Sequence, residues 1–102
     1  MKEAQRPKIK DLLASQEFGK DFLLKGWVRT KRGNKKIAFV ALNDGSSINN
    51  IQIVFDVPKF DETAIDMVTT GACIAVKGTL VESMGKGQSV ELQAKELKIF
   101  GP

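Results

Sequence analysis

Hydrophobic positions recur with a period of two along most of the chain, beginning near Phe22. β-branched and aromatic residues dominate these segments, and clusters of Gly, Asn, Asp and Ser separate them. This pattern predicts strands with one buried face, because successive side chains of a strand point to opposite sides. The expected strands are Phe22–Arg32, Lys36–Asn43, Ile48–Asp56, Ala72–Glu82 and Ser89–Phe100.

Two short helices are predicted outside these strands. The segment Pro7–Ala14 has apolar residues at i, i+3 and i+4, which is typical of a helix that could close one end of a barrel. Between the third and fourth strands, Asp61 can cap a helix that runs to about Thr70. Gly71 can supply the left-handed residue that ends it.

The turn residues and the order of the elements together predict the fold class. Asn43-Asp44-Gly45-Ser46 is expected to join strands two and three through the loop Asp44–Ser47, and Gly85-Lys86-Gly87 to join strands four and five. The order β-β-β-α-β-β is that of an OB-fold, a mainly β, five-stranded Greek-key barrel. Gly26 and Gly78 interrupt the two long strands where a small barrel must bend.

The composition restricts the chemistry to be expected. A chain of 102 residues, 42% of them hydrophobic, can bury one core, and we divide it into an extension with a short helix, 1–20, and a barrel, 21–102. No apolar run approaches the roughly 20 residues of a membrane span, and the N-terminus has no signal-peptide pattern, so we expect a cytoplasmic protein. The chain has no histidine and a single cysteine, Cys73, which we expect to be a buried or half-buried strand residue. We therefore predict no catalytic residue and no metal site.

Positive charge is concentrated in one part of the chain. The net charge is only +4, but no acidic residue lies between Asp21 and Asp44. The basic residues of that interval are Lys25, Arg29, Lys31, Arg32, Lys35 and Lys36. Such a stripe is typical of a binding surface for an anionic partner and also of an ordinary solvated face.

The alternation leaves two assignments open for Phe39. If Ala38, Val40 and Leu42 point inward, Phe39 and Gln52 point outward, and the expected loop places them opposite each other. If the other face is buried, Phe39 is a core residue. An exposed aromatic ring can stack on an unpaired base, worth about 1–3 kcal/mol, and a glutamine amide can hydrogen-bond a base edge.

The first strand supplies charge to the same region. Arg29 and Lys31 alternate with apolar or small residues, and Arg32 follows them, so a guanidinium group could contact a phosphate or a base. Trp27 shares the parity of Arg29, but an indole beside a glycine at a bend is expected to pack at the end of the barrel.

Three ordered segments of the chain resemble a known family. They are Gly26-Trp27-Val28-Arg29-Thr30-Lys31-Arg32, Phe39-Val40-Ala41-Leu42-Asn43-Asp44-Gly45-Ser46 and Ile51-Gln52-Ile53-Val54. Together they resemble the N-terminal anticodon-binding domain shared by aspartyl-, asparaginyl- and lysyl-tRNA synthetases. Leu-Asn-Asp-Gly-Ser at the turn, and Ser83-Met84-Gly85-Lys86-Gly87-Gln88 before Val90-Glu91-Leu92-Gln93-Ala94, are closest to the asparaginyl branch.

The resemblance implies a role for each matching residue. Phe39 is expected to stack on the central uridine of the anticodon, Gln52 to hydrogen-bond that uridine, and Arg29 and Arg32 to hold neighbouring nucleotides. Glu91 and the hairpin from Ser83 to Gln88 fall where family members approach the first anticodon base. The expected partner is the anticodon loop of tRNA(Asn).

The resemblance also implies what lies outside this chain. Family enzymes activate their amino acid with ATP and magnesium in a C-terminal catalytic domain, through which they dimerise, and that domain's motifs are absent from this sequence. We therefore expect this chain to be a non-catalytic module that binds no cofactor and is monomeric by itself. The full-length protein is expected to be a homodimeric asparagine-tRNA ligase. The alternatives are an aspartyl or lysyl relative, a general single-strand-binding OB domain, and a structural or oligomerisation barrel.

Overall fold

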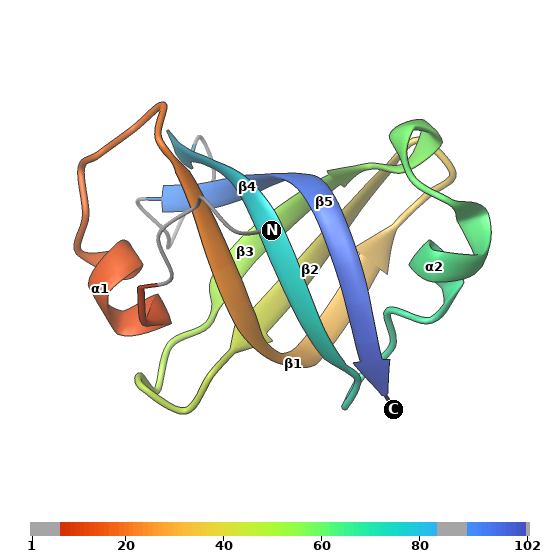
Figure 1. Ribbon diagram of the computed structural model, residues 1–102, viewed down its shortest axis with the longest axis horizontal. Coiled ribbons are helices and arrows are strands. Elements are labelled where there is room, and N and C mark those ends of the chain that lie inside the picture. The colour runs from red at the N-terminus through yellow and green to blue at the C-terminus, as the bar shows by residue number, and fades with distance from the viewer. Residues whose placement is uncertain (1–6, 84–89, 102) are drawn as a thin grey trace.

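The computed structural model describes residues 7–83 and 90–101, which form a closed five-stranded barrel with a short helix at each end (Figure 1). In chain order the elements are α1 Ile9–Leu13, β1 Asp21–Gly33, β2 Ile37–Asn43, β3 Ile51–Asp56, the 3₁₀ turn η1 Val57–Lys59, α2 Glu62–Asp66, β4 Cys73–Glu82 and β5 Val90–Gly101. Around the barrel the strand order is β1-β2-β3-β5-β4, and β3 runs parallel to β5. The predicted OB-fold is confirmed, including the helix between β3 and β4.

The alternating apolar residues of the strands fill the barrel interior. The inward residues of the two central strands are at most 3% exposed: Ala38, Val40, Leu42, Ile51, Ile53 and Phe55. Burying a large apolar side chain contributes about 1.5–3 kcal/mol, so this set stabilises one choice of inner face. Phe39 and Gln52 therefore point outward, each only partly buried. The alternative in which Phe39 belongs to the core is wrong.

Two glycines allow the strands to approach closely where the barrel closes. A Cβ atom at Gly26 would lie 2.3 Å from the carbonyl oxygen of Asn43, and one at Gly78 would lie 2.3 Å from that of Gln93. Near Gly26, β1 changes partner, because residues 21–27 pair with β4 and residues 27–33 with β2. Both glycines therefore lie where neighbouring strands approach too closely for a side chain, which suits the predicted closure of a small barrel.

β1 contains a bulge that the alternation did not predict. Val28 and Thr30 pair with consecutive residues of β2, which leaves Arg29 as an extra residue in β1. One extra residue reverses the alternation beyond it. Arg32, rather than Lys31, therefore points to the same side of the sheet as the outward residues of β2. The expectation that Arg29 and Lys31 lie on one face, alternating with Val28 and Thr30, is wrong.

The connection between β2 and β3 is longer than the predicted four-residue loop. β3 begins at Ile51 instead of Ile48. The side-chain amide of Asn43 donates to the carbonyl oxygen of Ser47 at 3.1 Å and to Oδ1 of Asn50 at 2.9 Å. These hydrogen bonds hold the chain in a loop where a tight hairpin was expected.

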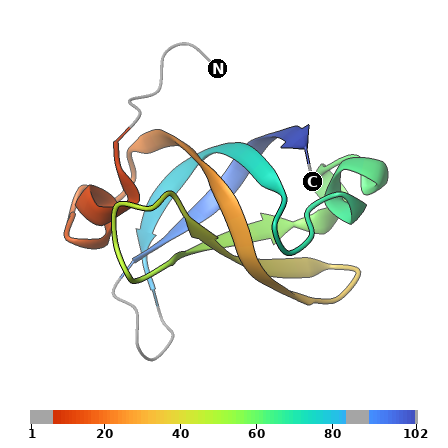
Figure 2. The ribbon, with the colours of Figure 1, turned by 90° about the horizontal axis from the view of Figure 1, so that it is seen from below.

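The same loop anchors α1 across one end of the barrel (Figure 2). Oδ2 of Asp44 accepts a hydrogen bond from the backbone N–H of Ile9, and Oγ of Ser46 accepts one from that of Lys10, both at 3.0 Å. The first amides of a helix have no partner within the helix, so the loop satisfies two of them. Ile9 and Leu12 are 0% and 1% exposed, and α1 closes the barrel end as predicted, although it is shorter than expected.

α2 is also shorter than predicted. The carboxylate of Asp61 accepts a hydrogen bond from the backbone N–H three residues later, at 3.2 Å, which confirms the predicted cap. The helix ends at Asp66, before the β-branched run of residues 68–70, whose stiff side chains lower helix propensity. Gly71 has the predicted positive φ of 91°, but it lies beyond the helix, in the turn that leads to β4.

The hydrogen bonds to Asp44 make its carboxyl group more acidic. Partial burial raises the pKa, but hydrogen bonds from the Ser46 hydroxyl and from the backbone amides of Ile9 and Ser46 outweigh burial, and the pKa of Asp44 lies below its ordinary value. A carboxyl group whose pKa is lowered by folding contributes stability above its unfolded pKa of about 3.9. That stability is lost as the pH falls through the folded pKa.

We expect Asp44→Asn to lower the free energy of unfolding by about 1–2 kcal/mol at pH 7, because an amide can replace only one of the two acceptor oxygens. The difference from the unsubstituted protein should begin to shrink below about pH 4, where the unfolded carboxyl group becomes protonated, and should disappear as the pH falls through the lowered pKa of the folded Asp44. Urea unfolding at pH 7 and at pH 2–3 measures both effects. Asp66→Asn, which removes an exposed carboxylate from α2, is the control and should cost less than about 0.5 kcal/mol. A difference that does not change with pH would contradict the role of the Asp44 charge.

Candidate nucleic-acid interface

Four of the predicted binding residues lie together on the outside of the barrel, on adjacent strands. Arg32 of β1 pairs with Phe39 of β2, and Gln52 of β3 pairs with Glu91 of β5. The strands that carry them are consecutive neighbours in the barrel. Adjacent strands are about 4.8 Å apart, so the set extends over about 15 Å. We call this set, Arg32, Phe39, Gln52 and Glu91, the outer face.

Arg32 and Phe39 form a contact between a cation and an aromatic ring. The guanidinium carbon of Arg32 lies 5.7 Å from the centroid of the Phe39 ring, within the range of a cation–π interaction. Among residues 7–83 and 90–101, neither Arg29 nor Arg32 forms an ion pair. The positive charge of Arg32 is therefore available to an anionic ligand beside the ring.

Phe39 and Gln52 are diagonal neighbours and do not lie directly opposite each other. Phe39 pairs with Val54, and Gln52 pairs with Ala41, so the predicted pairing of Phe39 with Gln52 is wrong by two residues. The loop between β2 and β3 causes the offset. An even offset keeps every side chain on its face, and diagonal neighbours are about 7–8 Å apart. The ring and the amide therefore still share one surface.

A hydrogen bond joins Gln52 to Glu91. Nε2 of Gln52 donates to Oε2 of Glu91 at 2.8 Å, and both side chains are partly buried. The two residues are far apart in the sequence, and the parallel pairing of β3 with β5 brings them together. Sequence reasoning named both residues but did not predict this contact.

The other basic residues of the stripe take different positions. Nζ of Lys31 donates to the carbonyl oxygen of Ile65 at 2.6 Å, so Lys31 ties β1 to α2 and does not join the outer face. Arg29 is exposed at the bulge, three positions before Arg32. The structure thus places Arg32 directly beside Phe39, and Arg29 further along β1.

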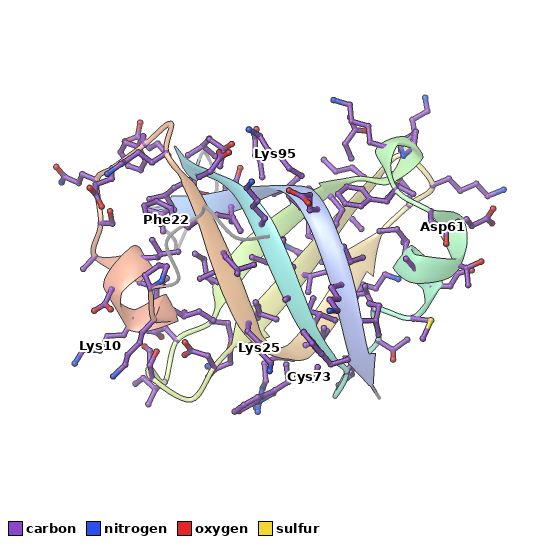
Figure 3. The ribbon with its side chains drawn as sticks, viewed as in Figure 1. Lys10, Phe22, Lys25, Asp61, Cys73 and Lys95 are labelled. Atoms are coloured by element: carbon purple, nitrogen blue, oxygen red, sulfur yellow. The ribbon has the colours of Figure 1, made fainter. Side chains whose placement is uncertain are left out.

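A cleft of about 800 Å³ opens beside Arg32, at the end of the barrel that carries α2. The turn between β1 and β2, η1 and α2 line it, and Figure 3 shows Asp61 at this end. Its charged lining residues are Lys31, Arg32, Lys35, Glu62 and Asp66. Because Arg32 lines the cleft and also contacts Phe39, the cleft borders the outer face.

Trp27 is more exposed than the predicted packing role allows. Its exposed fraction is 42%, and that of Phe100 is 49%. Nζ of Lys25 lies 4.5 Å from the centroid of the Phe100 ring, on the side of the barrel where Figure 3 shows Lys25 and Cys73. Trp27 and Lys25 are two residues apart in β1, before the bulge, so they lie on the same face of the strand, and both are exposed. The charged Lys25 was thus the feature of the sequence that indicated an exposed Trp27.

Cys73 is half-buried in β4, as predicted. Within residues 7–83 and 90–101 there is no group of three His, Cys, Asp or Glu side chains that could hold a metal ion, and no helix is long and apolar enough to cross a membrane. The hairpin expected from Ser83 to Gln88 lies, apart from Ser83, outside the described residues.

Comparisons with known proteins agree with the resemblance drawn from the sequence. The chain is 50% identical over 101 residues to an asparagine–tRNA ligase of Bacteroides fragilis, covering 99% of this chain and 22% of that protein. It is 58% identical over 99 residues to that of Cytophaga hutchinsonii, covering 95% of this chain and 21% of that protein. The chain thus spans about a fifth of the length of these relatives. The asparaginyl-tRNA synthetase of Entamoeba histolytica superposes with a TM-score of 0.77 at 26% identity, over 96% of this chain and 24% of that one.

A family model matches residues 22–100, and it describes an OB-fold nucleic acid binding domain of the tRNA anticodon type. Those residues extend from β1 to β5 and include every residue of the outer face. The chain therefore belongs to the tRNA anticodon family of OB-fold nucleic acid binding domains.

Proposed function

We propose that this chain is the anticodon-recognition module of an asparaginyl-tRNA synthetase and binds the anticodon loop of tRNA(Asn) through the outer face. The observation that carries the proposal is the arrangement of an aromatic ring, a guanidinium group and an amide on one side of the barrel. The similarity to asparagine–tRNA ligases along almost the whole chain supports it.

Phe39 would provide the stacking surface for the central base. A base that stacks on an aromatic side chain gains about 1–3 kcal/mol, whichever base it is. The guanidinium group of Arg32, 5.7 Å from the ring centroid, would contact a phosphate next to the stacked nucleotide. Arg29 at the bulge would contact a neighbouring phosphate of the same strand.

Gln52 would distinguish the stacked base from other pyrimidines. Ala41, its partner on β2, has only a methyl group, so the side chain opposite Gln52 on β2 is small. Uracil presents a carbonyl and an N–H, whereas cytosine presents an amino group and an unprotonated nitrogen. An amide held in one orientation can satisfy uracil and leave a polar group of cytosine unpaired, which costs about 1–3 kcal/mol.

The chemical step would take place outside this chain. The matched asparagine–tRNA ligases are about five times longer, since the chain covers 21–22% of them. We assign the ATP- and magnesium-dependent ligation of asparagine, and homodimerisation, to a C-terminal catalytic domain of the full-length protein in the cytoplasm. Residues 21–102 form the binding module, residues 1–20 precede it as an extension with α1, and the isolated module is monomeric.

The central test compares anticodon stem-loops with U or C at the middle position. The unsubstituted chain should prefer U by about tenfold to hundredfold, and both Gln52→Ala and Gln52→Glu should remove that preference. Equal binding of all loops, including a scrambled one, would indicate a general single-strand binder. No binding would indicate a structural barrel. A preference that survives both substitutions would show that Gln52 does not select the base.

Phe39→Ala tests whether the ring contributes mainly to RNA affinity or to the stability of the fold. We expect it to reduce affinity for the stem-loop by about 1–3 kcal/mol and to lower the free energy of unfolding by only about 1–2 kcal/mol, because the ring is partly exposed. Phe55→Ala, at a residue 0% exposed, should cost about 3–5 kcal/mol of stability. Ile37→Ala, on the same strand and face, is the control for binding. Chemical unfolding and fluorescence titration give the two energies, and a large loss of stability with unchanged affinity would contradict the stacking role.

Arg32→Gln should weaken binding to U and C loops alike. For each lost phosphate contact, the slope of log affinity against log salt should become shallower by about 0.7, the value for single strands. Arg29→Gln should act in the same direction. Lys20→Gln removes a charge one residue before β1, where Lys20 is paired with Glu17, and is the control with an unchanged slope. If both arginine substitutions leave the RNA affinity and the salt slope unchanged, the bound RNA does not cross this part of β1.

A further inference from the structure

We infer that Glu91 fixes the orientation of the Gln52 amide, and that this fixed orientation makes the outer face accept uracil and reject cytosine. The inference rests on the proposed function and assigns Glu91 the role of a positioning residue. It differs from a direct contact of Glu91 with the first anticodon base, which the family resemblance implies.

The carboxylate of Glu91 lies against the NH₂ end of the Gln52 amide. Oε2 of Glu91 lies 2.8 Å from Nε2 of Gln52, a normal distance for a hydrogen bond to a carboxylate. The residues that flank them are fixed in the core, since Ile51, Ile53, Val90 and Leu92 are at most 1% exposed. Both side chains therefore extend from rigid strands that are paired at this position.

A glutamine amide without a fixed orientation cannot distinguish the two pyrimidines. Rotation by 180° about its last side-chain bond exchanges the carbonyl oxygen and the NH₂ group. In one orientation the amide matches the carbonyl and N–H of uracil, and in the other it matches the amino group and bare nitrogen of cytosine. Stacking on Phe39 does not distinguish them either, because both bases have similar rings. Selectivity for uracil therefore requires a second group that favours one orientation.

Glu91 has the chemistry that this second group needs. An ionised carboxylate only accepts hydrogen bonds, so it can face the NH₂ group of Gln52 but not its carbonyl oxygen. Rotating the amide to match cytosine would lose a charge-assisted hydrogen bond and bring two acceptors together. A lost hydrogen bond to a charged group corresponds to a change of about tenfold to hundredfold in affinity.

The charge of Glu91 also favours a role in selectivity over a role in affinity. A carboxylate on a surface that binds RNA repels the phosphates, so it lowers affinity for every loop. Among the residues that the structure describes, Glu91 is in no ion pair that would offset this repulsion. Its hydrogen bond to Gln52 is a local gain that depends on the orientation of the amide.

The experiment measures dissociation constants for stem-loops with U or C at the centre, in the unsubstituted chain, Glu91→Gln and Glu91→Ala. Glutamine at position 91 can donate or accept, and alanine can do neither, so both variants remove the acceptor-only group that faces the NH₂ group of Gln52. We expect the U-to-C preference to fall by about tenfold, mainly through tighter binding of the C loop. Glu96→Gln, which removes a carboxylate from the same strand, should change both affinities equally.

The outcomes separate this inference from the proposed function. If the unsubstituted chain prefers U, Gln52→Ala removes the preference and both Glu91 variants keep it, the inference is overturned and the proposed function stands. Glu91 variants that weaken U and C loops by the same factor also overturn it, and would indicate direct contact with another base. If the unsubstituted chain shows no preference for U, the proposed function fails and the inference fails with it. Thermal unfolding of each variant confirms that the folded protein is compared, and Glu91→Ala serves if Glu91→Gln does not fold.

Discussion

The structure depends on the close approach of neighbouring backbones where five strands close into a barrel. At Gly26 and Gly78 a side chain would overlap a carbonyl oxygen of the adjacent strand, so the neighbouring strands can approach this closely only because these residues lack a Cβ atom. Near Gly26, β1 passes from pairing with β4 to pairing with β2. The bulge at Arg29 lies three residues further along β1, and it places Arg32 on the same side of the sheet as Phe39. The part of β1 that closes the barrel thus also positions Arg32 on the outer face.

The sequence predicted the faces of the strands better than their registers. Period-two alternation is a local property. It separated the two faces of each central strand correctly and placed Phe39 and Gln52 on one of them, but it left open which face is buried, and the burial of Ala38, Val40 and Leu42 decides this. Register depends on how each loop closes. The side-chain hydrogen bonds of Asn43 lengthen the connection between β2 and β3, and the alternation gave no signal of them. The bulge at Arg29 and the contact between Gln52 and Glu91 arise from strand pairing, so they could not be predicted from spacing alone.

The segment Asn43-Asp44-Gly45-Ser46 shows how one motif can carry both resemblance and stability. It is part of the resemblance to the synthetase family, yet its side chains bond to the fold itself. Asp44 and Ser46 hold α1 on the end of the barrel, and Asn43 holds the loop. A family match at such a position therefore indicates shared architecture. The side chains proposed to contact nucleic acid lie outside this loop, on the outward sides of β2 and β3, where Phe39 and Gln52 point away from the core.

Base selection by this domain would depend on topology as much as on residue type. Gln52 and Glu91 are 39 positions apart in the sequence and become neighbours only because β5 returns to run parallel to β3. In a sheet of consecutive hairpins, the strand beside β3 would be β4, and the amide would lack this carboxylate. A barrel can therefore have an exposed aromatic ring and a glutamine in the right places and still bind uracil and cytosine equally. By this argument, a stacking residue indicates binding to single-stranded nucleic acid, and an amide whose orientation is fixed by a neighbouring strand indicates selection of one base.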